Sequence, residues 1–99
     1  MASRARRVSG NVFRDLGFPA SESEHLKIRS DLMILLTKLI EERGLTQSQA
    51  AHLLKVTQPR VSDLVRGKIE RFSVDTLIEM IGHTGASVSV VVKRRRRAA

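Results

Sequence analysis

Residues 44–85 carry helix start and stop signals at such short intervals that this stretch has room only for short helices and tight turns. The stop signals are glycines, which favour the left-handed conformation that follows a helix, at Gly44, Gly67 and Gly85. The start signals are hydroxyl side chains that can accept a hydrogen bond from the first helical turn, at Thr46, Thr57 and Ser73. These signals predict helices over residues 47–54, 58–66 and 74–83, with a basic loop at 68–72.

A longer helix is predicted before them, from about residue 22 to residue 43. Ser21 is its expected N-cap, and Glu24 completes a capping box. Its apolar residues recur at helical spacing and form one broad face, made of Leu26, Leu32, Met33, Leu35, Leu36, Leu39 and Ile40. Ile34 lies off this face and is a candidate for contact with a partner. Ser30 and Asp31 leave open a division into two helices.

Residues 86–92 alternate in a different way, with a period of two and with β-branched side chains at Val88, Val90 and Val92. This pattern predicts a β-strand. Since a lone strand cannot satisfy its own backbone groups, it needs a partner strand. Three partners stay open: the same segment of a second copy, the sheet of another protein, or residues 8–13 of this chain.

Charge and composition exclude several classes of protein. The formal net charge is +8, but residues 1–7 and 93–97 hold eight of the 18 basic residues, so residues 8–92 balance ten basic with ten acidic residues. The chain contains no cysteine, tryptophan or tyrosine, which excludes a disulfide scaffold and argues against aromatic platforms for single-stranded nucleic acid. We find no nucleophile–base pair, metal-ligand cluster or phosphate loop. We therefore expect no enzyme, no catalytic residue, no metal and no cofactor, and no membrane association.

Residues 46–67, TQSQAAHLLKVTQPRVSDLVRG, place two of the short helices on either side of a tight turn. Their predicted packing residues are Ala51, Leu54, Val56, Val61 and Leu64. The segment from Leu45 to Lys68 resembles the helix-turn-helix of the Cro/repressor class, the XRE family. Lys55 departs from that family, in which glycine is usual at the turn, and this leaves a different turn geometry open.

The whole layout resembles HigA-like antitoxin regulators, through VFRDLGF at residues 12–18, FSVDTLIEMI at 72–81 and the valine-rich strand. The resemblance implies an all-α, five-helix, lambda-repressor-like domain with a C-terminal strand. It also implies a dimeric, bacterial autorepressor that neutralises a RelE/HigB-like ribonuclease toxin. An antitoxin acting mainly through protein contact, or a non-specific basic nucleic-acid binder, remains the alternative.

In such a motif the second helix enters the major groove with its N-terminal residues at the base edges. The predicted base contacts are Gln58, Arg60, Ser62 and Asp63, where Asp63 either accepts from cytosine or pairs with Arg60. The predicted phosphate contacts are Gln47, Thr57, Arg66, Lys68 and Arg71. Residues 45–71 hold five basic and two acidic residues, so the positive charge coincides with this motif.

The sequence therefore predicts four segments. They are a basic, flexible N-terminal arm at residues 1–20, a helical helix-turn-helix domain at 21–85, a strand for dimer or partner pairing at 86–93, and a basic flexible tail at 94–99. The expected partners are double-stranded operator DNA, a second copy and a toxin protein. The expected location is the cytoplasm, on the nucleoid when DNA is bound. The KRRRR run at 93–97 is either a solvated tail or a source of unspecific DNA affinity.

Overall fold

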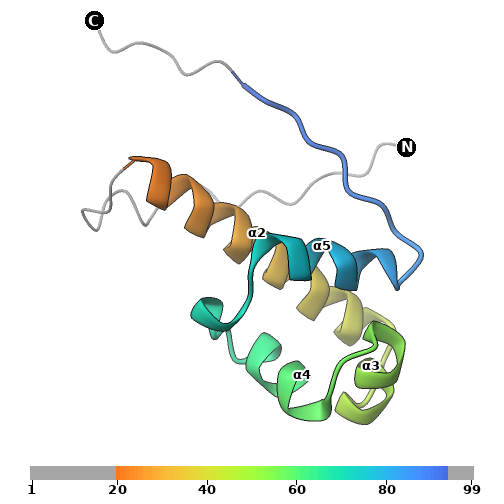
Figure 1. The fold of residues 1–99 in the computed structure, drawn as a ribbon. Coiled ribbons are helices and arrows are strands. Elements are labelled where there is room, and N and C mark those ends of the chain that lie inside the picture. The colour runs from red at the N-terminus through yellow and green to blue at the C-terminus, as the bar shows by residue number, and fades with distance from the viewer. Residues whose placement is uncertain (1–19, 94–99) are drawn as a thin grey trace, which may run out of the picture.

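The computed structural model describes residues 20–93. This part of the chain is helical, and Figure 1 shows its elements in order. They are α2 (Ala20–Glu42), α3 (Gln47–Leu54), α4 (Gln58–Val65), the 3-10 helix η1 (Ile69–Arg71) and α5 (Val74–Gly82). The described residues thus hold four α-helices and no strand, so the five-helix count and the C-terminal strand are not confirmed there.

The long helix α2 is continuous across Ser30 and Asp31. Asp31 accepts a hydrogen bond from Lys27 Nζ at 3.0 Å, one helical turn back. This engages one carboxylate oxygen, Oδ2, in a contact within the helix, away from the backbone groups with which an aspartate can compete. Because α2 begins at Ala20, Ser21 lies inside the helix, and its prediction as the N-cap was wrong.

Helices α2 and α4 end in the same hydrogen-bonded turn, known as the Schellman motif. After α2, Leu45 N–H donates to Ile40 O and Gly44 has a φ of 62°. After α4, Lys68 N–H donates to Asp63 O and Gly67 has a φ of 74°. The predicted stop signals at these two glycines are confirmed by their left-handed backbone. The loop predicted at 68–72 is shorter than expected because η1 forms inside it.

One hydrophobic core joins all the helices. It consists of Leu32, Met33, Leu36, Ile40, Ala50, Ala51, Leu54, Val61, Leu64, Phe72, Leu77, Met80 and Ile81. The apolar face predicted for α2 is thus correct in its centre, but Leu35 is 42% exposed. Ile34 is exposed as expected, at 38%. Phe72, predicted in a loop, is buried because η1 directs it into the core.

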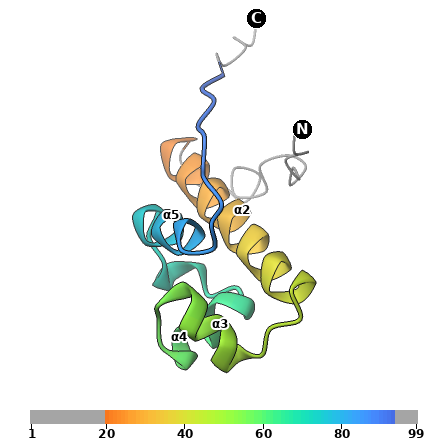
Figure 2. The same cartoon turned by 90° about the vertical axis from the view of Figure 1, so that its right-hand side faces the viewer.

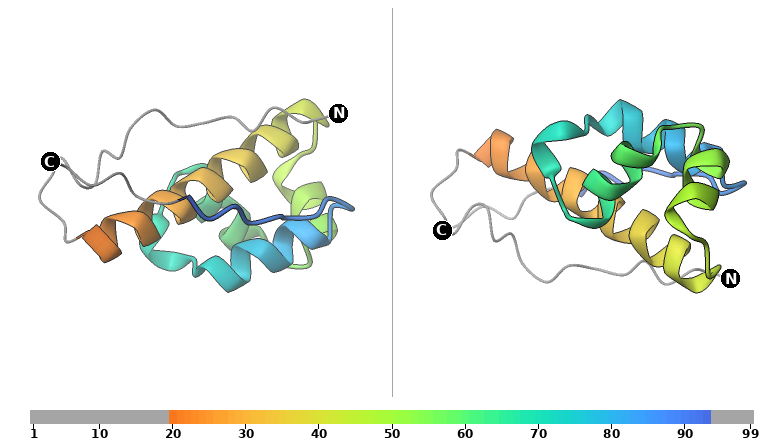
Figure 3. Two further views of the ribbon diagram at one scale, coloured as in Figure 1. Left: turned by 90° about the horizontal axis from the view of Figure 1, so that it is seen from above. Right: turned by 90° about the horizontal axis from the view of Figure 1, so that it is seen from below.

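The helices pack against one another in pairs. α2 packs against α5 and against α4, and α3 packs against α4. Figures 1 and 2 place α3 and α4 together at one side of the molecule, while residues 86–93 leave from the opposite side. Seen from above, that segment passes over α2 and α5 (Figure 3). The helix-turn-helix region is therefore not covered by the C-terminal segment.

Residues 86–93 have no regular secondary structure. The side chains of Val90, Val91 and Val92 are 78%, 77% and 88% exposed, and Val88 is 37% exposed. The predicted strand is absent because no second strand lies within residues 20–93 to take its hydrogen bonds. The proposed pairing with residues 8–13, the N-terminal arm and the arginines at 94–97 lie outside the described residues.

Candidate nucleic-acid interface

The first helix of the motif, α3, starts at a capping box. Gln49 N–H donates to Thr46 Oγ1 at 3.1 Å, and Thr46 N–H donates to Gln49 Oε1 at 2.9 Å. This reciprocal pair satisfies two backbone N–H donors that would otherwise face only water. The prediction that Thr46 caps this helix is confirmed, and Gln49 completes the box.

The interior of the motif is closely packed. Leu54, Val61 and Leu64 are at most 1% exposed, and Val56 lies partly buried against them. Ala51, expected where the two helices approach, is 8% exposed, and its neighbour Ala50 is fully buried. Sequence reasoning missed Ala50, although two adjacent alanines between polar residues were visible. The small side chains let α3 approach its neighbours, which fixes α4 in place.

The turn between α3 and α4 passes through Lys55, whose φ of 59° and ψ of 44° lie in the left-handed region. Val56 N–H donates to Ala51 O at 3.0 Å across this turn. Lys55 therefore occupies the position that Gly44 and Gly67 occupy after the other two helices. The departure from the usual glycine changes the residue while the turn keeps a glycine-like geometry, at a cost of about 1–2 kcal/mol for a side chain in this conformation.

The N-terminus of α4 is turned to solvent. Thr57 has N-cap backbone angles, but its hydroxyl makes no capping hydrogen bond. Gln58 and Pro59 are exposed, and Ser62 on the next turn is half-buried. Pro59 lies in the first turn, where its missing N–H costs no intrahelical hydrogen bond. The exposed start of α4 thus offers the Gln58 amide and the Thr57 hydroxyl to a ligand.

The Arg60 side chain, in contrast, contacts other residues of the protein. Its guanidinium carbon lies 4.4 Å from the ring centroid of Phe72, and its Nη1 donates to Arg71 O at 2.8 Å. Asp63 accepts from Arg71 Nη1 at 3.3 Å. The predicted Asp63–Arg60 pair is therefore not formed, because the Arg60 side chain extends toward η1 and leaves Asp63 to Arg71.

Cations surround the C-terminal end of α4. Arg66 and Arg71 are exposed and Lys68 is half-buried, while Gln47 is exposed at the start of α3. Arg71 keeps a 54% exposed side chain although it pairs with Asp63, which is only 16% exposed. Arg71 therefore has N–H groups left for an anion, since a guanidinium has five donors.

A hydrogen-bonded link that sequence reasoning missed supports η1 from α2. Arg29 Nη1 donates to Ile69 O at 3.3 Å and to Phe72 O at 3.4 Å. No local signal marks this contact, because about forty residues separate the partners in sequence. The η1 turn is thus held from α2 on one side and from α4 on the other.

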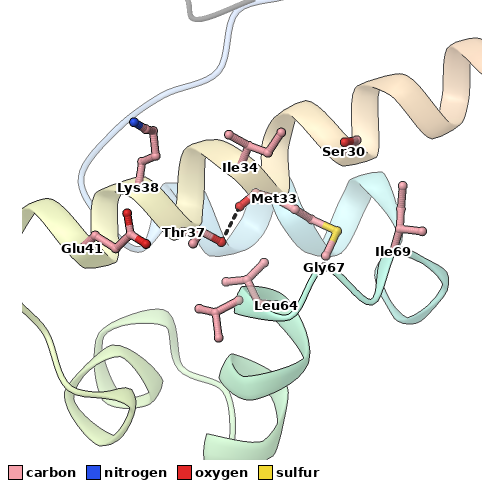
Figure 4. A pocket seen from close by; sticks show the side chains of 10 residues that line it. Ser30, Met33, Ile34, Thr37, Lys38, Glu41, Leu64, Gly67 and Ile69 are labelled. Carbon is pink, nitrogen blue, oxygen red and sulfur yellow. Dashed lines mark hydrogen bonds between the residues drawn. The ribbon is translucent and has the colours of Figure 1, made fainter. Parts of the chain in front are cut away.

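A hollow of about 490 Å³ lies between α2 and the C-terminal end of α4 (Figure 4). Met33 and Ile34 of α2 line it together with Leu64, while Lys38 and Glu41 lie toward one end. Thr37 does not offer its hydroxyl proton there, because it donates to Met33 O at 2.9 Å.

Among residues 20–93 there is no group of three or more potential metal ligands. Between residues 20 and 93, no helix combines the length and the apolar character that crossing a bilayer requires.

Comparison with known proteins agrees with this geometry. A family model described as a helix-turn-helix domain matches residues 12–93. That range includes both the VFRDLGF segment and the valine-rich segment that carried the resemblance. No curated protein matches the chain.

Among solved structures, the chain is similar to one described as "Putative XRE Family Transcriptional Regulator". The two are 31% identical, with a TM-score of 0.72, and the match covers 79% of this chain and 91% of the other. Both findings extend well beyond the short α3–turn–α4 segment, over which the sequence resemblance was most specific. The chain therefore belongs to the helix-turn-helix domain family and to the XRE family of that solved relative.

Proposed function

We propose that this protein is a transcriptional regulator that binds double-stranded DNA in a sequence-specific way, with α4 in the major groove. The observation that carries the proposal is the α3–turn–α4 unit, whose buried interior fixes α4 while the first turn of α4 faces solvent. This is the arrangement in which a recognition helix presents its N-terminal residues to base edges. Basic residues at the other end of α4 supply the charge that DNA requires.

Polar and basic residues of the motif are assigned to bases and to the DNA backbone in this proposal. Gln58 is suited to adenine, because its amide can donate and accept at once, and Ser62 lies one turn further along the same helix. The proposed contacts to the DNA backbone are Gln47, Thr57, Arg66, Lys68 and Arg71. Thr57 is well suited to a phosphate because its hydroxyl is not used as a helix cap.

The regulator is proposed to act as a homodimer, because one recognition helix reads too few base pairs and two-fold dimers place two half-sites about 34–36 Å apart. The strand predicted at residues 86–92 would pair antiparallel with its own copy. Three consecutive exposed valines, Val90 to Val92, support this pairing, since such a surface favours a covered state. Residues 86–93 also leave the side opposite α3 and α4 (Figure 2), so pairing there keeps α4 accessible.

The test is titration of labelled duplex from the gene's own upstream region, against a scrambled duplex, at physiological salt by fluorescence anisotropy. The proposal expects a preference of about a thousandfold or more. Gln58→Ala is expected to reduce that preference by about ten to a hundredfold, the value of one good base contact. His25→Ala, an exposed residue on α2, is the matched control and leaves it unchanged.

Two results would contradict specific DNA binding. Equal affinity for both duplexes that collapses as salt rises would assign the binding to the basic arms. Loss of all binding after deletion of residues 93–99 would be the second such result. A specific regulator instead keeps its preference for the upstream duplex after that deletion and loses only affinity common to both duplexes.

The second candidate function is neutralisation of a RelE/HigB-like toxin by direct contact, as the resemblance to HigA-like antitoxins implies. The specific observation in its favour is the apolar surface on α2, where Ile28, Ile34 and Leu35 are 38–45% exposed. The unpaired segment at 86–92 also suits addition to another protein's sheet. Purification from native lysate tests this role: a stoichiometric ribonuclease partner supports it, and a lone homodimer under several conditions counts against it.

A further inference from the structure

Arg60 lies in the part of α4 that would face base edges, yet its side chain is committed to the protein itself. Its guanidinium covers the ring of Phe72, which is 2% exposed, at 4.4 Å. The same guanidinium donates to the backbone oxygen of Arg71 at 2.8 Å. A stacked arginine with a short hydrogen bond holds one defined geometry, because the planar group satisfies the ring and the carbonyl together.

A second contact also joins α4 and η1, and here the donor lies on η1. Arg71, on η1, donates to Asp63 of α4 at 3.3 Å. Arg60, Asp63, Arg71 and Phe72 thus form a closed link between α4 and η1, which we call the Arg60 brace. Arg29 of α2 holds η1 from the far side through Ile69 O and Phe72 O.

We propose that Arg60 is a positioning residue rather than a reader of base sequence. It holds η1 against α4 so that Arg71 and Lys68 meet the DNA backbone while α4 lies in the groove. The inference rests on the proposed function, and it assigns base discrimination to Gln58 and Ser62. Asp63 shares the positioning role, because its carboxylate orients the Arg71 guanidinium.

The alternative is that Arg60 leaves the brace and binds guanine O6 and N7 in the complex. That movement would uncover Phe72 and remove the hydrogen bond to Arg71 O, so the η1 cations would lose their support when DNA binds. The two roles predict different effects of the same substitution. A residue that reads a base changes the preference at one base pair, whereas a positioning residue changes the affinity for all DNA sequences alike.

The first experiment is selection from a randomised duplex pool by the full-length wild-type chain and by Arg60→Gln. Glutamine suits adenine where arginine suits guanine, so a reader would change one position of the selected consensus. The inference expects an unchanged consensus. Gln58→Arg is the matched control on the same helical turn, and it is expected to change one position.

The second experiment is a double-mutant cycle on the selected duplex. Arg60→Ala is expected to weaken binding to every single-base variant by the same factor, up to about tenfold for one lost charged contact. The slope of log K against log salt is expected to fall in magnitude by about 0.9, the value of one phosphate. Combining Arg60→Ala with Arg71→Ala is expected to add little, whereas its combination with Arg66→Ala is additive because Arg66 is outside the brace.

A third measurement separates positioning from a general loss of folding. Proton shifts of the Arg60 δ-methylene report its place over the Phe72 ring, in free protein and in the DNA complex. The inference expects upfield shifts that persist on binding, and it expects Arg60→Lys to restore part of the lost affinity through the same carbonyl and ring. Circular dichroism on each variant confirms that the helices are intact.

The failures of the two proposals differ. A wild-type chain that selects no consensus overturns the proposed function and this inference together. A clear wild-type consensus that loses or changes one position in Arg60→Gln overturns the inference alone. Additivity of Arg60→Ala with Arg71→Ala, or loss of the ring-current shift on binding DNA, also overturns it.

Discussion

Lys55 stands in a left-handed turn that glycine adopts more easily, and its replacement by glycine measures what that conformation costs. Its φ is 59°, and within residues 20–93 it is the non-glycine residue with positive φ. A side chain pays about 1–2 kcal/mol in this region. Glycine in turn loses more chain entropy on folding, about 0.5–1 kcal/mol. The difference predicts that Lys55→Gly raises the free energy of unfolding by about 0.5–1 kcal/mol.

The assay is urea denaturation followed by circular dichroism, with thermal unfolding at the same protein concentration because dimerisation would shift both midpoints. For a domain of this size the expected rise in Tm is about 2–8 °C. Lys55→Ala is the matched control, since it removes the charge but keeps the Cβ atom. We expect its stability to stay within about 0.5 kcal/mol of the wild type, as for an ordinary surface substitution.

Two outcomes would refute the reasoning. If Lys55→Ala stabilised the protein as much as Lys55→Gly, the effect would come from the lysine charge and not from the backbone. If Lys55→Gly destabilised it, the turn would not hold the left-handed geometry in solution. DNA affinity is a further readout, because a turn whose geometry is kept leaves α4 in its place.

Four further substitutions test other parts of the argument. Thr46→Ala removes a capping hydrogen bond and is expected to cost about 1 kcal/mol in urea denaturation, whereas Thr57→Ala leaves stability unchanged and weakens DNA binding; equal stability losses would contradict the assigned caps. Leu54→Ala, at 1% exposure, is expected to cost about 2–5 kcal/mol through the cavity it leaves, and a loss under 1 kcal/mol would contradict the core. Val90→Lys is expected to lower the dimer fraction in analytical ultracentrifugation without changing monomer stability; an unaffected dimer would remove residues 86–92 from the interface.

Much of the candidate site could be predicted because its signals are local. The caps at Thr46 and Ser73 satisfy donors within three residues, and the glycine turns depend on single backbone angles. The burial of Leu54, Val61 and Leu64 follows from helical periodicity in the same short segment. The side-chain partners of Arg60 and Asp63 could not be predicted, because they lie eight to twelve residues away, on η1 and at Phe72 directly after it.

The sequence by itself determined where the helices of the motif begin and end, since capping and left-handed turns are settled by residues in contact along the chain. Tertiary structure alone decided that Leu35 stays exposed on α2, because burial depends on which face meets α4 and α5. It also decided that Arg60 lies on Phe72, because only packing brings η1 against α4. The valine-rich segment shows the same division: its alternation is written in the sequence, but a strand exists only where another backbone takes its hydrogen bonds.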